Sequence, residues 1–421
     1  MTTTPTDPGL AAAARVDEAR LRGRHEAMAR HGARPDGGVN RQAFSAEDAA
    51  ARSELAAWAA EFGFELYIDP ITNLYVRRPG TDPDAAPVMS GSHLDSQPMG
   101  GRYDGAYGVL AAFEALQAIA EAAIATRRPI EAVAWANEEG SRFQPGMTGS
   151  FVFAGLTPLD QAIAVRDPEG VAIADTLAAM RAATPAAIDR PLGIPVAAYV
   201  EAHIEQGPRL EAAAVPIGVV TGIQGARWFA VEVSGDAAHA GTTPRAQRRD
   251  ALQAAVRMVA ALEALTTDPA DVVRFTIGRF EVSPGSPNTV PERVLFTIDL
   301  RHPEADRLNR FGDAIEGVCR EQAGPCGVTV TETQTSMPVV FPDAMRETIR
   351  QAAAALGFAY LVLPSGAGHD AKALAAVAPA AMIFIPCEKG ISHNPAENAK
   401  PADLAAGARV LAKTLVDLAN R

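Results

Sequence analysis

The chain has 421 residues, a formal net charge of −12 at pH 7 and 48% hydrophobic residues. This length exceeds what one hydrophobic core usually organises, so we expect two domains. The negative charge argues against a nucleic-acid partner, because neutralising phosphates requires a basic face and none stands out. Small molecules or peptides are therefore the expected ligands.

The sequence gives no sign of secretion, a membrane span or a disulfide framework. Residues 1–9 are polar and lack a basic start followed by an apolar run, and no apolar run is long enough to cross a membrane. The cysteines Cys319, Cys326 and Cys387 show no Cys-x-x-Cys spacing. We expect a cytoplasmic protein without a membrane partner, in which His and carboxylate side chains would hold any metal.

The first half of the chain alternates between helical and extended patterns. Ser45 has the Ser-x-x-Asp spacing of an N-cap, and Gly63 would end the helix that follows. The expected elements, in order, are a helix at 11–30, a helix from the Ser45 cap through 62, hairpin strands at 64–69 and 73–76, a strand at 86–89, a helix at 104–125, and strands at 130–135 and 196–200. This alternation predicts an α/β layered core.

The character of the sequence changes beyond residue 215. The next expected elements are strands at 218–222 and 227–234, a helix at 249–265, strands at 272–282 and 291–299, a helix at 304–322 and a strand at 327–332. This β-α-β-β-α-β order predicts an inserted two-layer α+β domain at 216–335. The first domain, 1–215 and 336–421, would resume with strands at 359–363 and 380–385 and a closing helix at 401–419.

Polar residues follow three of the apolar strands of the first domain. His93 and Asp95 follow the first of these strands, Glu138 and Glu139 the second, and His203 the third. Since ligands bind beyond the carboxyl ends of strands in open α/β sheets, these residues could meet in one crevice. Two of these sites have a structural alternative: His93 could be a structural histidine with the aspartates as turn or capping residues, and the glutamate pair could be a solvated loop.

A fourth polar segment, 391–397, places His393 in a turn after the strand at 383–386. The candidate metal ligands are then His93, Asp104, Glu139, His203 and His393. Five such ligands suit two zinc ions that share a bridging carboxylate. Glu138 would stay free to accept a proton, and Asp95 would orient His93.

Five motifs together resemble one enzyme superfamily. They are Gly91-Ser92-His93-Leu94-Asp95-Ser96, Gly101-Arg102-Tyr103-Asp104-Gly105, Asn137-Glu138-Glu139-Gly140-Ser141-Arg142-Phe143, His203-Ile204-Glu205-Gln206-Gly207 and Gly390-Ile391-Ser392-His393-Asn394-Pro395-Ala396-Glu397. The chain is similar over nearly its whole length to the aminoacylase/carboxypeptidase G superfamily of di-metal amidohydrolases. Within it, the chain resembles the hydantoinase/carbamoylase branch, which contains N-carbamoyl-L-amino acid hydrolase, β-ureidopropionase and allantoate amidohydrolase.

The resemblance implies a phosphorylase/hydrolase-like di-zinc catalytic domain with an inserted dimerisation (lid) domain. It assigns His93, Asp104 and His203 to one metal, and Asp104, Glu139 and His393 to the other. Glu138 would be the general base. Zinc is the first choice for these two divalent ions, while manganese, cobalt and nickel also suit such ligands.

The resemblance also implies which residues hold the substrate. His239, Asn288 and Arg301 would come over the metals, with His239, a donor to the developing oxyanion, and Asn288 supplied by the partner of a homodimer. Gln206 and the loop of Gly366, Ala367, Gly368, His369 and Asp370 would line the same pocket. Structural alternatives remain: Arg301 could form a surface ion pair, and His369-Asp370 could be a capped helix start. At most one of Arg248 and Arg249 would face the ligand, and Asp250 could cap the next helix.

The implied reaction is cleavage of the C–N bond of an N-carbamoyl-L-amino acid or related ureido acid to the free amino acid, carbon dioxide and ammonia. Allantoate, ureidoglycolate and N-acyl amino acids are alternative substrates. A rival of a different class is a binding module that has lost activity. The presence of all five ligands and Glu138 argues against that rival, because a degenerate member should lack one of them. Closure of the small domain over the site is a further hypothesis.

Overall fold

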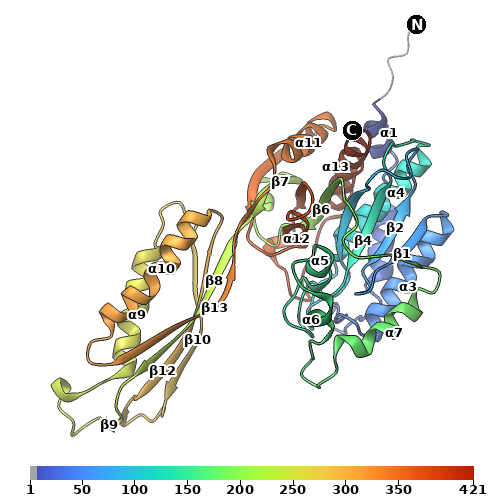
Figure 1. The fold of residues 1–421 in the computed structure, drawn as a ribbon. Coiled ribbons are helices and arrows are strands. Elements are labelled where there is room, and N and C mark those ends of the chain that lie inside the picture. The colour runs from blue at the N-terminus through green and yellow to red at the C-terminus, as the bar shows by residue number, and fades with distance from the viewer. Residues whose placement is uncertain (1–6) are drawn as a thin grey trace. The chain divides into compact units, whose positions relative to one another are not determined.

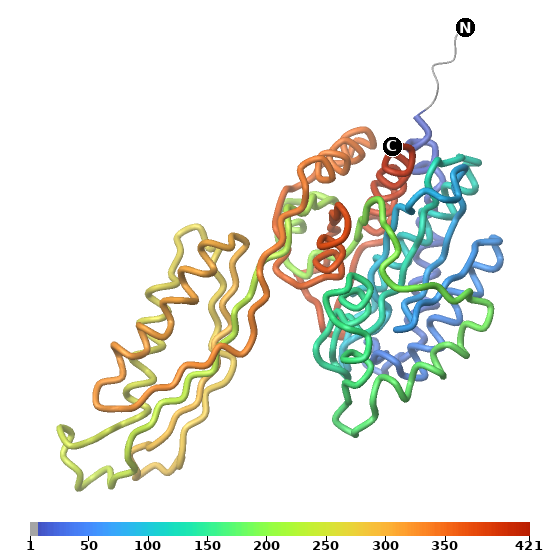
Figure 2. The backbone as a smooth tube through the Cα atoms, in the orientation of Figure 1, coloured from blue at the N-terminus to red at the C-terminus, as the bar shows by residue number. Residues whose placement is uncertain are grey.

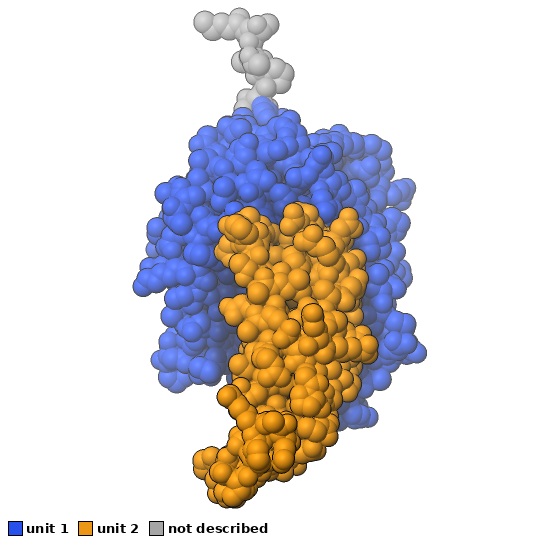
Figure 3. Space-filling view, turned by 90° about the vertical axis from the view of Figure 1, so that its left-hand side faces the viewer, with its two compact units in different colours: residues 1–222, 340–421 blue, residues 223–339 orange. Residues whose placement is uncertain are grey.

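The computed structural model of the chain describes residues 7–421, which divide into two compact units (Figure 3). Unit 1 comprises Met1–Gly222 and Val340–Arg421, and unit 2 comprises Ile223–Val339. Of the segment 1–9, expected to lack a secretion signal, residues 1–6 lie outside the described residues, and Gly9 belongs to helix α1 (Pro8–Ala13). Among the described residues, no helix has the length and apolar character needed to cross a membrane.

Unit 1 is built around a ten-stranded mixed sheet with the order β14-β7-β16-β6-β3-β4-β2-β1-β5, in which β15 pairs with β7 (Figure 1). Its central strands run parallel: β16 (Ala380–Ile385), β6 (Ala198–Ile204), β3 (Val88–His93) and β4 (Ile130–Trp135). All four are buried along their length, which accounts for their continuous apolar patterns. Because they are parallel, their carboxyl ends share one edge of the sheet.

The outer strands of this sheet are β1 (Glu65–Ile68), β2 (Leu74–Arg78), β5 (Ile188–Asp189), β7 (Ile217–Ile223), β14 (Val339–Val340) and β15 (Tyr360–Ser365). Helices α4 (Ala106–Glu121) and α13 (Pro401–Ala419) pack on each other and on the central strands. Small residues permit this packing: a Cβ on Gly108 would lie 2.4 Å from the carbonyl oxygen of Ala202. The first and last helices of the chain, α1 and α13, are in contact (Figure 2).

The remaining helices of unit 1 are α2 (Glu18–Met28), α3 (Ala46–Glu61), α5 (Thr148–Phe153), α6 (Leu159–Ile163), α7 (Ile173–Ala183), α8 (Arg209–Ala213), α11 (Asp343–Ala355), α12 (Ala371–Leu374) and the 3-10 turn η2 (Glu388–Gly390). The Ser45 cap is confirmed, because its side chain accepts a hydrogen bond from the N–H of Asp48. The single helix expected at 11–30 is wrong: Asp17 starts a second helix by accepting a hydrogen bond from the N–H of Arg20.

Unit 2 is a four-stranded antiparallel sheet with the order β10-β12-β8-β13, covered by two helices on one face (Figures 1 and 2). Alternate residues of the central strands, among them Val231 and Phe296, are buried with Met258 and Ile315 of the helices. The predicted β-α-β-β-α-β order is confirmed, but the strand expected at 218–222 is β7, which pairs in the sheet of unit 1. The elements of unit 2 are β8 (Gly225–Ser234), β9 (Ala238–His239), η1 (Arg245–Gln247), α9 (Ala251–Thr266), β10 (Arg274–Ser283), β11 (Thr289–Val290), β12 (Arg293–His302), α10 (Ala305–Gln322) and β13 (Gly327–Ser336).

His25 in α2 makes the stability of unit 1 sensitive to acid. Its side chain is buried against Tyr103 and Tyr107, and burial lowers its pKa from 6.5 to about 3. Below pH 6.5 the unfolded chain therefore binds a proton that the folded chain excludes. Relative to His25→Phe, the wild type should lose roughly 1 kcal/mol of unfolding free energy per pH unit as the pH falls below that value. Urea unfolding of both proteins across this range measures the difference, and parallel curves would contradict it.

Candidate metal centre

The carboxyl edge of the central strands brings the predicted ligands together. His93 is the last residue of β3, and His203 lies near the end of β6. Both strands are longer than their apolar runs predicted, so these histidines stand within the sheet rather than in the loops that follow. Glu138 and Glu139 follow β4, and Asp104 precedes α4.

Asp104 stands between two groups of possible metal ligands. Its Oδ1 lies 3.3 Å from Nε2 of His203 and 4.0 Å from Nε2 of His93. Its Oδ2 lies 3.2 Å from Nε2 of His393, which is 3.5 Å from Oε2 of Glu139. Within each group the donor atoms lie within 4.8 Å of one another. One carboxylate thus offers a separate oxygen to each group, as a bridging ligand does.

Hydrogen bonds fix the orientation of the two buried imidazoles. Nδ1 of His93 lies 2.9 Å from the carbonyl oxygen of Asp95, and Nδ1 of His203 lies 2.9 Å from that of Ile204. Because a carbonyl only accepts, each Nδ1 is the donor, and in the neutral ring the lone pair sits on Nε2. Both Nε2 atoms face Asp104, which is the arrangement that a metal-binding histidine requires.

Asp95 also holds the glutamate loop in place. Its two carboxylate oxygens accept hydrogen bonds of 3.2 and 3.1 Å from the N–H groups of Glu138 and Glu139. The contact with His93 comes mainly from the main chain of Asp95, since its carboxylate lies 3.7 Å from Nδ1. One buried aspartate therefore links the end of β3 to the loop after β4.

The centre carries an excess of buried negative charge. Burial raises the pKa of Glu138 well above its usual range, and the charges of Asp370 and Glu139 add to this effect. Burial likewise raises the pKa of Glu139 to about 8, with Asp104 contributing. For Asp104, hydrogen bonds with His203 and His393 outweigh burial and hold its pKa well below the usual range. A divalent cation would relieve this repulsion, so the donor set and its charge fit a metal.

Unusual backbone conformations occur in the loops that carry these residues. Asn137, Gln206 and His393 all have a left-handed backbone, with φ of 53°, 54° and 53°. Each such residue costs about 1–2 kcal/mol, so the surrounding structure must hold it in place. Gly105 has φ of 63°, and a Cβ there would lie 2.2 Å from the ring of His93. Only glycine fits that position beside the imidazole.

Several residues of the centre were given no role by the sequence analysis. Glu397 accepts hydrogen bonds of 2.8 and 3.0 Å from the N–H groups of Tyr103 and Asp104, and the hydroxyl of Ser392 donates to Oδ2 of Asp104 at 2.9 Å. Both residues lie in the 391–397 motif, and this position could have indicated that they belong to the site. Glu201 is the third such residue: it joins the expected ligand His203 and the expected pocket residue His369 in a further group of possible ligands.

Glu397→Ala should weaken metal binding by about 10- to 100-fold, because it frees the loop that presents Asp104. Metal titration with a fluorescent competitor measures this change. The matched control is Glu388→Ala, which removes a nearby exposed carboxylate bonded to Asn398. Equal losses in the two variants would contradict the positioning role of Glu397.

Two pocket predictions concern unit 1. The amide of Gln206 donates to Oδ2 of Asp104 and to the Ser392 hydroxyl, both at 3.0 Å, so this side chain lies in the metal centre. The loop from Gly366 to Asp370 lies beside His203, since the His369 ring is 4.4 Å from the His203 ring. Ala367 bonds through its main chain to Ser365. Asp370 is the N-cap residue of α12, so the expected helix start is confirmed, but its side chain makes no capping hydrogen bond.

The other predicted substrate residues belong to unit 2. His239 in β9 pairs with Thr289 of β11, and the carbonyl of Asn288 accepts from the N–H of Ala240, so His239 and Asn288 lie on the two paired strands of one small sheet. Arg301 in β12 forms an ion pair of 2.8 Å with Asp299. Asp250 caps α9, as its alternative interpretation proposed, by accepting from the N–H of Gln253.

Comparisons with known proteins agree on one family. The profile of peptidase family M20/M25/M40 matches residues 89–417. An N-carbamoyl-L-amino acid amidohydrolase of Geobacillus stearothermophilus is 40% identical over 399 residues, which cover 92% of this chain and 95% of the relative. An allantoate amidohydrolase of Escherichia coli is 37% identical over 392 residues, which cover 92% and 95%. A hydantoinase/carbamoylase family amidase from Burkholderia multivorans has a crystal structure that matches with a TM-score of 0.91 and 42% identity, over 96% of this chain and 98% of that one.

Proposed function

Because the chain belongs to the peptidase M20/M25/M40 family of hydrolases, we propose that it hydrolyses N-carbamoyl-L-amino acids to the free amino acid, carbon dioxide and ammonia. The observation that carries this proposal is the position of Asp104, whose two oxygens face separate groups of donors. Glu138 belongs to neither group, yet its Oε2 lies 3.4 Å from Nε2 of His93. A carboxylate that lies beside the ligands without belonging to either group is available for proton transfer.

We propose two divalent ions, zinc in the first instance, held by His93, Asp104 and His203 and by Asp104, Glu139 and His393. When bound, they would polarise the scissile carbonyl and acidify a water molecule. The buried carboxylate of Glu138 would take a proton from the attacking water and deliver it to the departing nitrogen. Asp95 would keep Glu138 in place through the N–H of that residue.

The inserted domain would hold the substrate and form a homodimer. In this proposal Arg301 binds the substrate carboxylate, and His239 and Asn288 reach the site of the partner chain. The pairing of β9 with β11 supports a shared role, because a movement of this two-stranded sheet carries both residues. Gln206 and the loop at Gly366 and Ala367 would complete the pocket. Sedimentation that finds only an active monomer would refute the dimer.

A second candidate substrate is allantoate. Allantoate amidohydrolases of Escherichia coli and Bacillus subtilis are 37% and 34% identical to this chain, a range that overlaps the carbamoylase relatives at 36–40%. Both substrates present a ureido group to the same ligands and would use Glu138 in the same way. The difference lies in contacts to a second ureido arm.

The test is ammonia or amino acid release from a panel of substrates by metal-reconstituted protein. The panel contains N-carbamoyl-L-amino acids, N-carbamoyl-β-alanine, allantoate, and formyl and acetyl amino acids, each with and without a chelator. We expect the highest kcat/KM with an N-carbamoyl-L-amino acid and loss of turnover with the chelator. Metal-independent turnover, or no hydrolysis of any of these compounds, would overturn the proposal.

A further inference from the structure

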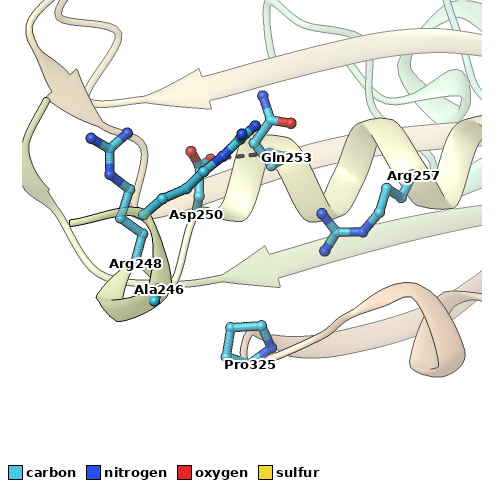
Figure 4. Close-up of a pocket in the computed structure, with 7 residues that line it drawn as sticks. Ala246, Arg248, Asp250, Gln253, Arg257 and Pro325 are labelled. Atoms are coloured by element: carbon cyan, nitrogen blue, oxygen red, sulfur yellow. Dashed lines mark hydrogen bonds between the residues drawn. The ribbon is translucent and has the colours of Figure 1, made fainter. Parts of the chain in front are cut away.

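Unit 2 contains a cavity of about 380 Å³ whose lining the proposed reaction does not use (Figure 4). It lies where the 3-10 turn η1 meets the start of α9, next to the segment that leads into β13. Its volume falls within the range of about 300–1,000 Å³ that is typical of small-molecule sites. The residues that give it its character are Arg245, Arg248, Asp250, Gln253, Arg257 and Pro325.

Positive charge dominates this cavity. Three arginines, Arg245, Arg248 and Arg257, and one carboxylate, that of Asp250, line it, which gives a formal charge of +2. The whole chain carries −12, so the charge of this cavity is opposite in sign to that of the chain. Within residues 7–421, none of the three arginines has an ion-pair partner, whereas the adjacent Arg249 pairs with Asp236 at 3.2 Å.

The existing contacts orient Arg248 and Arg257 without neutralising their charges. Arg248 donates from Nε to the carbonyl of Thr243 at 3.0 Å and from Nη2 to that of Ala240 at 2.7 Å. Arg257 donates from Nη2 to the carbonyl of Gln322 at 3.2 Å. Carbonyls fix a guanidinium without cancelling its charge. These two side chains therefore lose less conformational freedom when an anion binds.

The single carboxylate already has a structural task. Oδ1 of Asp250 accepts the N–H of Gln253 and so caps α9, as the dashed line in Figure 4 shows. The role of Asp250 as a helix cap therefore does not depend on the arginines. The side chain of Arg245 has no hydrogen bond in the part of the chain that the structure describes. Guanidinium groups match the oxygen geometry of phosphate and carboxylate ligands.

We propose that this cavity binds a doubly charged oxyanion of the phosphate class, either inorganic phosphate or the phosphate group of a small ester. The charge of +2 matches a phosphate dianion. A singly charged carboxylate would leave one positive charge uncompensated in the cavity. The lining contains no residue assigned to the proposed hydrolysis, so the test measures binding rather than turnover.

Isothermal titration calorimetry at constant ionic strength tests the proposal on the metal-loaded full chain. The ligands are inorganic phosphate, glycerol phosphate and acetate. We expect saturable phosphate binding that Arg245→Gln and Arg257→Gln each weaken by about tenfold or more, with acetate binding at least about tenfold more weakly than phosphate. Thermal unfolding of each variant verifies that it is folded.

The matched control is Arg310→Gln on α10, which removes one exposed guanidinium and the same charge far from the lining of the cavity in sequence. It should bind phosphate like the wild type, which separates the cavity from general electrostatic attraction. The losses in Arg245→Gln and Arg257→Gln separate the cavity from phosphate held at the metal centre. Crystals soaked in selenate should show the anion among Arg245, Arg248 and Arg257. Absence of saturable binding, or equal losses in the control and the cavity variants, would overturn the proposal.

Discussion

Replacing Glu138 with glutamine should lower kcat for ammonia release by about 10³- to 10⁴-fold, while the bound metal stays unchanged. Glutamine keeps the shape of the side chain and its main-chain contact with Asp95, but it cannot accept a proton. Because the loss concerns a step after binding, KM should change little. Steady-state kinetics and elemental analysis of the same preparation measure both quantities.

Two results would contradict this role for Glu138. A variant that loses metal in proportion to activity would make Glu138 a ligand, and one that keeps nearly full activity would make another group the base. Glu65→Gln serves as the control, because it changes an exposed glutamate of β1 in the same unit. Its kcat and metal content should equal those of the wild type.

Asp104→Ala should abolish turnover and release metal from both groups, a loss in kcat/KM of at least about 10⁴-fold. The reason is geometric, because the two oxygens of Asp104 face different groups of ligands. Among the described residues, Asp104 alone belongs to both the group of His203 and the group of His393. His203→Ala and His393→Ala should each remove only one ion. Elemental analysis after equilibrium dialysis gives the three stoichiometries.

Comparing the metal content of the three variants tests whether Asp104 bridges the two groups. If Asp104→Ala retained as much metal as His393→Ala, the carboxylate would not bridge the groups. Asp189→Ala is the matched control, since its side chain is 82% exposed on β5 of the same unit and pairs with Arg181. It should retain metal and activity. A uniform loss across all four variants would indicate damage to the fold rather than to the site.

The predicted ligands lie close together in the structure, and the sequence pattern that predicted this is a simple one. Apolar runs mark buried strands, and polar residues directly after them mark the edge at which parallel strands end. The lengths of β3 and β6 were underestimated, because Ser90, Ser92 and Glu201 are polar yet buried in the sheet. Ser92 donates to Glu201 at 2.7 Å, so these two polar side chains are paired inside the sheet, and hydrophobicity alone ends such a strand too early.

Contacts between distant segments were beyond this kind of inference. Glu397 anchors the N–H of Asp104 across 293 positions of the chain, and nothing in the local pattern gives that distance. His369 was placed near the site only through the resemblance, and its contact with the ring of His203 depends on where the loop before α12 folds back. The helix at 11–30 was overextended because an alanine-rich pattern hides the cap at Asp17.

The two ligand groups differ in how far water reaches them. The His393 side chain is 50% exposed, whereas those of His93 and His203 are only 3% and 1% exposed. Ions placed as proposed would therefore leave at different rates, the one beside His393 first. Brief dialysis against a chelator should yield a protein with one ion per chain. In a cell, the position beside His393 would then be the last to fill and the first to lose its ion.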